Sequence, residues 1–542
     1  MTSALTPVLS DRYVANWTHV LMTTAFGIMF LFLSYLPLQP SITWFQVSEG
    51  RLTLNGGRVG AMPPQFPLAE GMSDQSQSWL SKLLMASVEH WGGDAALGSM
   101  QTLVIFSTLL LLGLSFHRIT GVNALTLGGV IFCFYMSWSQ FTAFQTSTFG
   151  SLCATALLWL LSHASVWRQL NTSRTRQSAN RFLLWSLPLL IALWANLDSS
   201  FLLGLAVVAC CLVGQVIDHF RNHSWRRLLK NPQVLKWLFI TEICCLTTLL
   251  QPEGFFVWTN LLQGDIGSLG PASIFHRPLT LLSWSGAGLS CLWLTALLLF
   301  RLSRSDVRSV EILLLCGGSA VLAVSAQQSA VVVPFIVLAL TRHATNVHQQ
   351  WRKKQASNLI SEQNANKPQS MKFALSLTCL LLGWVSFALS PLSQPLLGGT
   401  GRSAEQMYGQ GTPLALTAIL QKQGDTSMAW APAEWSDWLA WKLGSDAKFF
   451  TGSHLGRFPA QVRRDYVAVY RGEFGWNKIL DRYGVETLII NKRSQTELLR
   501  EAKSQNSDWR AVYEDDQCVL LRRRVSDRLA ATRSEEGGTL SW

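Results

Sequence analysis

Residues 40–97 read PSITWFQVSEGRLTLNGGRVGAMPPQFPLAEGMSDQSQSWLSKLLMASVEHWGGDAAL. This polar stretch separates the first apolar segment, residues 17–38, from the second, residues 98–116. It contains two amphipathic pieces joined by a proline-rich turn, Met62-Pro63-Pro64. Loops of this length are uncommon in compact proteins and are usually ordered for a function. We therefore predict that this loop, Gln39–Leu97, is structured.

The rest of the chain up to residue 393 has the composition of a membrane protein. Of 542 residues, 49% are hydrophobic and only 14% are charged, whereas soluble domains carry about 25% charged residues. A membrane-spanning helix needs about 20 apolar residues. The sequence predicts a mainly α membrane protein with about eleven such helices, at residues 17–38, 98–116, 120–139, 148–167, 182–197, 200–219, 236–251, 286–300, 311–325, 329–341 and 373–392.

The basic residues predict the orientation, because Lys and Arg are retained on the cytoplasmic side. They cluster in alternate connections, which include Arg168–Arg181, Arg221–Lys236, Arg301–Arg308 and Arg342–Lys372. We expect the amino terminus inside, and the Gln39–Leu97 loop and the carboxy-terminal region outside. The same distribution explains the net charge of +12, so no nucleic-acid partner is expected.

Composition changes after the last span, and residues 394–525 predict a small soluble α/β domain. Strands are expected at Ser427–Ala431, Lys448–Thr451 and Val485–Asn491, with a hairpin that turns at Asp515-Asp516. Helices are expected between them. Residues 526–542 read as a flexible tail, and residues 1–393 as the transmembrane domain.

Several short motifs resemble one family. WFQVSEGRLTLNGGRVGAMPPQFPL (44–68) and QSWLSKLLMASVEHWGG (77–93) resemble the loop after the first span of the GT-C polytopic membrane glycosyltransferases and their bacterial relatives. WANLDSSFLLG (194–204) and LLQPEGFFVW (249–258) resemble span-junction motifs of these proteins. AEWSDWLAWKL (433–443), FFTGSHLGRFPAQVRRDY (449–466) and GWNKILDRYGVETLIIN (475–491) resemble their external domain.

The resemblance implies a GT-C-like fold in the bacterial cytoplasmic membrane. It implies a transferase that takes a sugar from a polyprenyl-phosphate donor at the external face and passes it to an envelope acceptor. In this family an acid just after the first span acts as base or metal ligand. Such a carboxylate can activate an acceptor hydroxyl or hold a divalent cation against a phosphate. The cofactor stays unknown, with a divalent metal ion left open.

The sequence departs from the family at the expected site positions. Pro40, Ser41 and Ile42 stand where the family's acids fall, and Gln46 stands where a His follows the aromatic pair. A His-Glu pair of the second helix corresponds to Gln77-Ser78, and the His of the first span junction corresponds to Asp198. The Asn and Tyr of the second junction are Gln251 and Glu253. The expected acidic and ionisable site residues are thus largely substituted.

Three remaining acids are catalytic candidates. Glu49 is nearest to the expected position, although it could instead pair with Arg51 or Arg58 on a solvated face. Asp74 follows a Gly-containing turn, where an Asp often caps a helix. Asp198 lies at a span junction, and acids at membrane depth usually have a functional reason. The alternative is that a short junction exposes Asp198 to water.

Candidates for substrate binding lie in one predicted outer loop. They are Glu253, His276 and Arg277, and the last two are suited to contacting a phosphate. Their alternative role is anchoring at the membrane interface. Trp435, Trp438 and Trp441 could stack on sugars, although a core helix is the simpler use of such a stripe. His454 and Arg457 are candidates by resemblance alone.

Two functions from different classes follow. One is a glycosyltransferase dependent on a lipid-linked sugar, in which Glu49, Asp74 or Asp198 replaces the family's acid. The other is a non-catalytic scaffold or partner subunit of the same architecture. A transporter is disfavoured, because the spans show few of the ionisable residues that mark a transport pathway.

Overall fold

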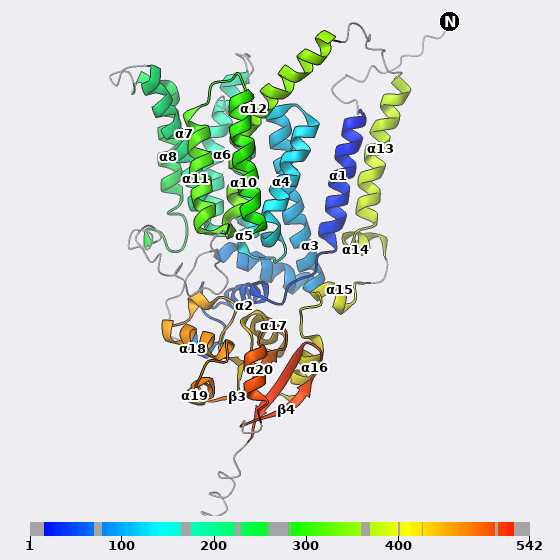
Figure 1. Ribbon diagram of the computed structural model, residues 1–542, viewed down its shortest axis with the longest axis vertical. Coiled ribbons are helices and arrows are strands. Elements are labelled where there is room, and N and C mark those ends of the chain that lie inside the picture. Colours follow the sequence, from blue (N-terminus) through cyan, green and yellow to red (C-terminus); the bar gives the residue numbers. More distant parts are fainter. Residues whose placement is uncertain are drawn as a thin grey trace, which may run out of the picture. The chain divides into compact units, whose positions relative to one another are not determined.

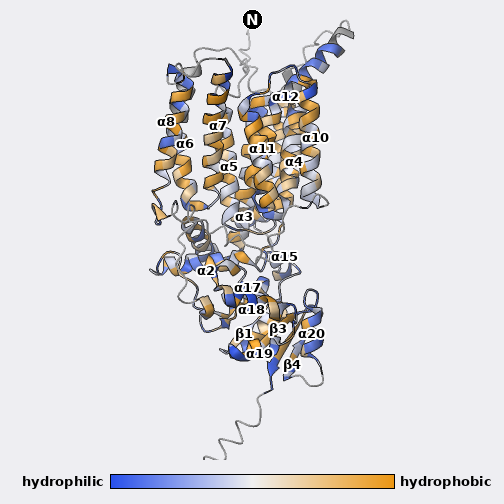
Figure 2. Cartoon of the chain, turned by 60° about the vertical axis from the view of Figure 1, so that its left-hand side comes forward, coloured by the Kyte–Doolittle hydropathy of each residue, from blue (hydrophilic) through white to orange (hydrophobic). Residues whose placement is uncertain are grey.

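The computed structural model describes residues 16–69, 78–163, 175–222, 228, 230–256, 258, 280, 283–358, 369–398, 401–424, 426–504 and 508–524. Within these ranges the chain divides into two compact units. One is a bundle of apolar helices, and the other is a mixed α/β unit. Figure 2 shows the difference in hydropathy between the helices of the first unit and the second unit.

Each of the eleven predicted apolar segments falls on one helix of the first unit (Figure 1). These helices are α1 (Trp17–Ser34), α3 (Trp79–Thr120), α4 (Asn123–Phe141), α5 (Thr146–Ser162), α6 (Thr175–Leu197), α7 (Phe201–Asn222), α8 (Pro232–Thr247), α10 (Trp284–Leu302), α11 (Ser309–Val324), α12 (Ser329–Asn358) and α13 (Gln369–Ala388). Among the described residues, six helices are long and apolar enough to cross a membrane. A bent pair, Phe373–Ala388 with Pro391–Leu397, makes up to seven. The chain is a multi-pass membrane protein.

Local chemistry sets the helix ends and bends. Asn16 caps α1, since its side chain accepts from the His19 amide at 3.2 Å. Helix α3 joins the second amphipathic piece of the first loop to the following span, and it bends at Gly93, whose φ is +65°. A residue with a side chain would be strained at that angle, so glycine permits the bend.

A buried ion pair joins α11 and α12. Arg342, the first residue after the predicted span 329–341, lies inside α12 and is only 8% exposed. Its Nε donates to Glu311 Oε1 at 2.8 Å, and its Nη2 donates to Oε2 at 2.9 Å. The guanidinium is accommodated there because the carboxylate of α11 satisfies it with two hydrogen bonds.

The second unit combines two distant parts of the sequence. Helix α2 (Ile42–Leu54) and the 3-10 helix η2 (Pro67–Ala69), both from the first loop, belong to the same compact unit as the chain from Tyr408 onward. The loop is joined to the sheet directly, because the Phe449 amide donates to the Gln65 carbonyl at 2.8 Å. Half of the first loop is therefore part of the carboxy-terminal fold.

The sheet of this unit has five strands in the order β2-β1-β3-β5-β4. They are β1 (Met428–Trp430), β2 (Lys448–Phe449), β3 (Val485–Asn491), β4 (Trp509–Glu514) and β5 (Cys518–Arg523). Strand β1 is parallel to β2 and β3, whereas β5 is antiparallel to β3 and β4. The predicted buried strand at Val485–Asn491 and the hairpin in the same sheet are confirmed.

Helix α15 (Ala404–Tyr408) leads into the second unit. That unit also contains α16 (Leu414–Gln423), α17 (Ala433–Leu443), α18 (Ala460–Tyr470), α19 (Trp476–Arg482) and α20 (Thr496–Ala502). Leu488, Ile489 and Ile490 of β3 have no exposed area. A strand covered on both faces needs continuous apolar residues, which is the pattern of VETLIIN. The predicted mainly α fold with a small α/β domain is confirmed.

Candidate functional site

Asp198 lies in the three-residue junction between α6 and α7 and is only 4% exposed. Its amide donates to the Trp194 carbonyl at 2.9 Å and so ends α6. Its Oδ2 accepts from the Ser200 amide at 3.0 Å, at the start of α7. Thr146 of α5 and the Ser199 amide also bond to this carboxylate. The alternative that the junction exposes Asp198 to water is wrong.

Neighbouring helices hold this junction in place. Ser81 of α3 donates to the Leu197 carbonyl, and Trp79 donates from Nε1 to Asn196 Oδ1 at 2.8 Å. Asn196 in turn donates to the Leu250 carbonyl at 3.0 Å, just beyond α8. The motif WANLDSS is therefore a meeting point of α3, α5, α6, α7 and α8, with a buried acid at its centre.

A glycine of α5 makes room for the acid. A Cβ atom added to Gly150 would lie 2.5 Å from both Asp198 Oδ2 and Ser200 Oγ. Real side chains do not approach this closely, so a larger residue at position 150 would force the junction away from α5. Gly204 of α7 similarly admits the ring of Trp194, whose Nε1 donates to Ser200 Oγ at 3.1 Å.

In the second unit, Glu49 of α2 is 2% exposed, so the alternative that it lies on a solvated face is wrong. Its Oε1 lies 3.2 Å from Nη1 of Arg457, which is 3% exposed. Arg457 belongs to the 3-10 helix η7 (Leu455–Arg457) and also donates from Nη2 to the Gly60 carbonyl at 2.6 Å. The arginine therefore ties two points of the first loop to the carboxy-terminal part of the chain.

Asp437 of α17 is a second buried acid of this unit, 1% exposed. Its Oδ1 accepts from the Ser453 amide at 3.1 Å, and the Ser453 hydroxyl donates to Oδ2. Burial raises the pKa of Asp437 to about 7, with smaller contributions from the nearby charges of Glu49 and Glu434, and the Ser453 bonds oppose the rise. Burial likewise raises the pKa of Glu434. Asp437 therefore titrates near neutral pH.

Aromatic side chains surround these acids. Trp44 of α2 lies 5.2 Å from the ring of Trp438 and 5.8 Å from the ring of Trp441. Trp435 and Trp438 are 3% and 2% exposed, so both are core residues. Arg51 stacks over the ring of Trp441 at 3.9 Å, a favourable cation–π geometry. Trp438 and Trp441 of α17 thus pack against Trp44 of the first loop. The tryptophan stripe is therefore the packed face of a core helix.

The remaining candidates differ in how far the structure describes them. Asp74, His276 and Arg277 lie outside the described residues. Glu253 lies in the turn after α8 and is partly buried. His454 packs its ring 5.8 Å from that of Phe45. The structure gathers Glu49, Asp437 and Arg457 in the second unit and Asp198 with its hydroxyl partners in the first.

The residues around these acids do not fit a metal ion. A hard divalent cation takes six or more oxygen ligands, usually with several carboxylates. Asp198 is surrounded by hydroxyl and amide donors, which point hydrogen atoms at its oxygens. No group of three metal-ligating side chains occurs among the residues the structure describes. We therefore derive no step through a metal.

Sequence reasoning did not single out Asp437, Ser453, Ser81 or Gly150. Asp437 did carry a signal, because it is an acid inside the otherwise aromatic and apolar stretch WSDWLAW. Ser81 and Gly150 carried none, since small residues are common in membrane helices. Both residues matter because of their contacts with the α6–α7 junction, which the sequence alone does not reveal.

Comparison with solved structures gives the class of fold. The structure is similar to the apo oligosaccharyltransferase of Archaeoglobus fulgidus, with a TM-score of 0.52 and 10% identity over 89% of this chain and 70% of that chain. The same archaeal enzyme, AglB, in complex with an inhibitory peptide and a dolichol-phosphate gives a TM-score of 0.50 at 10% identity, over 88% and 70% of the two chains. ArnT from Cupriavidus metallidurans bound to undecaprenyl phosphate gives 0.43 at 13% identity, over 94% and 99%.

The likeness to the archaeal oligosaccharyltransferase confirms the predicted GT-C-like fold. No protein-family model and no curated protein matches the sequence. At such low identity the structural likeness describes the fold, and the chemistry has to be argued from the residues of this chain.

Proposed function

We propose that this chain transfers a sugar from a polyprenyl-phosphate donor to an envelope acceptor at the external face of a bacterial cytoplasmic membrane. The observation that carries the proposal is the buried Asp198 carboxylate at the α6–α7 junction of a GT-C-like fold. The likeness to AglB, which was solved with a dolichol-phosphate, supports a lipid-phosphate ligand. A carboxylate held at a junction of spans is costly and usually functional.

In the proposed reaction, Asp198 accepts the proton of an acceptor hydroxyl. The hydroxyl oxygen forms a bond to the anomeric carbon of the sugar, while the bond from that carbon to the phosphate oxygen breaks. The polyprenyl phosphate leaves with the electron pair. The hydroxyls of Ser200 and Thr146 orient the carboxylate, and Arg277 remains the proposed phosphate-binding residue. General-base catalysis of this kind typically contributes about 10²–10⁴-fold.

A second candidate function is a non-catalytic scaffold of the same architecture. The specific observation in its favour is that Glu49, the acid nearest the family's catalytic position, is buried against Arg457 and joins two parts of the second unit. Asp198 in turn holds the start of α7 through the Ser200 amide. Both acids thus have structural partners.

The experiment that separates the two is sugar transfer by the purified full chain in liposomes, with polyprenyl-phosphate sugars as donors. We expect wild type to release polyprenyl phosphate, and Asp198→Asn to lose about 10²-fold or more of that activity while keeping its melting temperature. Asp94→Asn, at the distal end of the first loop, is the matched control and should stay active. Equal activity of wild type, Asp198→Asn and Glu49→Gln, or no activity in any, would favour the scaffold.

A further inference from the structure

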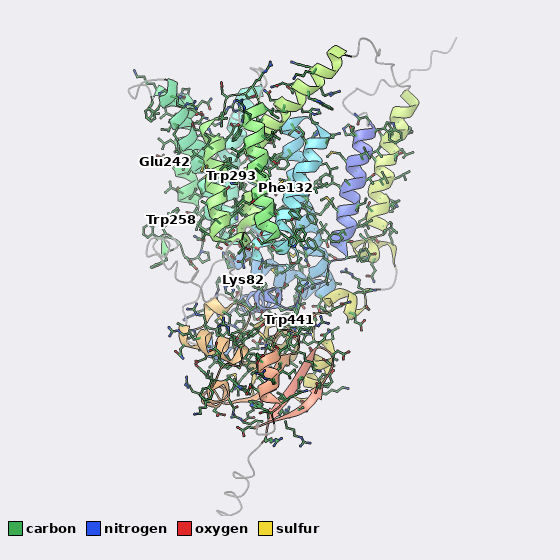
Figure 3. The ribbon with its side chains drawn as sticks, in the orientation of Figure 1. Lys82, Phe132, Glu242, Trp258, Trp293 and Trp441 are labelled. Carbon is green, nitrogen blue, oxygen red and sulfur yellow. The ribbon has the colours of Figure 1, made fainter. Side chains whose placement is uncertain are left out.

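Helix α8 carries a carboxylate on its exposed face. Glu242 is exposed and lies at the outer edge of the bundle, where Figure 3 labels it. Leu235, Phe239 and Leu246 are 42%, 53% and 64% exposed. Steps of four, three and four residues place these side chains and Glu242 on one stripe of the helix. Glu242 is thus the acid in an otherwise apolar exposed stripe.

Apolar surface continues on both sides of Glu242. At 1.5 Å per residue, Glu242 lies about 15 Å from Pro232 and about 7 Å from Thr247 along the helix axis. Beyond the end of α8, Leu250, Phe255 and Phe256 are 69%, 67% and 72% exposed. The carboxylate therefore lies within the apolar zone.

The neighbouring helix extends this surface. Helices α6 and α8 pack against each other, and Thr247 donates to the Pro188 carbonyl at 3.3 Å. Trp185, Leu189 and Leu193 of α6 are 78%, 72% and 48% exposed at helical spacing. We call the seven residues Trp185, Leu189, Leu193, Leu235, Phe239, Glu242 and Leu246 the α6–α8 face.

Within the part of the chain that the structure describes, no side chain forms an ion pair or hydrogen bond with Glu242. Lys236, the basic residue of the same helix, lies six positions earlier and so about 120° around the axis. A carboxylate facing lipid without a partner is costly and rarely retained. The α6–α8 face is thus suited to lipid except at Glu242, whose carboxylate needs a polar or charged partner that lipid chains do not supply.

We propose that the α6–α8 face is an intramembrane docking surface for a transmembrane helix of another protein, which places a Lys or Arg opposite Glu242. The apolar side chains supply the packing surface, and the carboxylate selects a basic partner by charge complementarity. Pairing of two copies through this face would bring Glu242 against Glu242, so the charge argues against a second copy. The exposed Leu294, Leu297 and Leu298 of α10 form a comparable face without an acid.

The test is photo-crosslinking of the full chain in its native membrane. A photoreactive amino acid replaces Phe239 on the α6–α8 face, and Leu297 of α10 in the control. We expect Phe239 to crosslink a protein whose attached peptide is an apolar helix containing Lys or Arg, and Leu297 to crosslink lipid. The Glu242→Lys change should lower the yield of the Phe239 crosslink about tenfold or more, whereas Glu242→Asp should retain that yield. Replacing the basic residue of the partner by Glu should restore the crosslink to the Glu242→Lys variant.

Other outcomes overturn the proposal. Crosslinks from Phe239 to lipid alone, to a second copy or to other residues of this chain would show that no partner helix docks on this face. An adduct whose yield is the same in wild type and Glu242→Lys would show that the charge of Glu242 does not contribute to docking. Unchanged melting temperature of the Glu242 variants shows that a lost adduct reflects docking and not unfolding.

Discussion

At the scale of single residues, each unit buries an acid among hydrogen-bond donors. Asp198 accepts from the Ser200 amide at 3.0 Å and from the hydroxyls of Ser200 and Thr146. Asp437 has the two Ser453 bonds but also nearby carboxylates, and burial dominates its pKa. An acid whose pKa is raised on folding binds its proton more tightly in the folded state. The folded state is therefore favoured by protonation of Asp437.

The raised pKa of Asp437 predicts how the stability of the protein changes with pH. The ordinary pKa of Asp437 is 3.8 and its folded pKa is about 7. The unfolding free energy should therefore fall as pH rises from about 4 to about 7, by about 2–4 kcal/mol. Asp437→Asn mimics the protonated acid, so this variant should lose that fall. Tryptophan-fluorescence melting of the full chain at pH 5 and pH 8 measures both.

The control is Asp446→Asn, at an exposed position of the same unit. It should melt like wild type at each pH. A wild-type protein whose melting temperature rises between pH 5 and pH 7 through Asp437 would contradict the raised pKa.

At the scale of elements, η7 and α2 are joined by one ion pair. Glu49 and Arg457 are 408 residues apart in sequence. Removing one partner of a buried pair costs about 3–5 kcal/mol, because it leaves the other charge buried. Arg457→Met should destabilise the second unit by that amount, and the double variant Glu49→Gln/Arg457→Met should recover at least half of it. Denaturant unfolding of the four proteins gives the coupling energy.

Arg471→Met is the matched control, since Arg471 and Glu473 form an ion pair in which both side chains are exposed. Such pairs contribute about 0–1 kcal/mol, so this change should be nearly silent. If Arg457→Met were equally silent, α2 would not be held by Arg457.

The elements themselves were largely predictable. The eleven apolar runs and the strand VETLIIN are local patterns. A helix in lipid and a strand covered on both faces each need a continuous run of apolar residues, which can be recognised in the sequence. The site was less predictable, because its contacts join distant residues. Glu49 with Arg457, and Gly150 with Asp198, are pairings that depend on the packed fold. Sequence could name Glu49, Asp198 and Arg457 as candidates, but it could not say which partners they have.

At the scale of the whole molecule, the predicted topology is compatible with the contacts of the helical unit. The α6–α7 junction meets the starts of α3 and α5. Gln140, near the end of α4, donates to Ser329 Oγ at 2.8 Å, at the start of α12. Each of these positions belongs to the end that the basic residues assign to the outside.

Labelling of cysteines in intact cells tests this orientation. Cysteines introduced at Ser73 and Ser494 should both react with a membrane-impermeant maleimide, because an even number of predicted spans separates the two positions. A cysteine at Arg304, in a predicted cytoplasmic connection, should react only after the cells are permeabilised. Reaction of one external position but not the other would contradict the eleven-span topology.

The proposed function is tested most directly by a cryo-EM reconstruction of the full chain in nanodiscs that contain a polyprenyl-phosphate sugar. We expect density for the sugar within hydrogen-bond reach of Asp198 or its hydroxyl partners Ser200 and Thr146, at the α6–α7 junction. A junction without donor, or donor bound at the opposite end of the helices near Glu311 and Arg342, would contradict the proposed function.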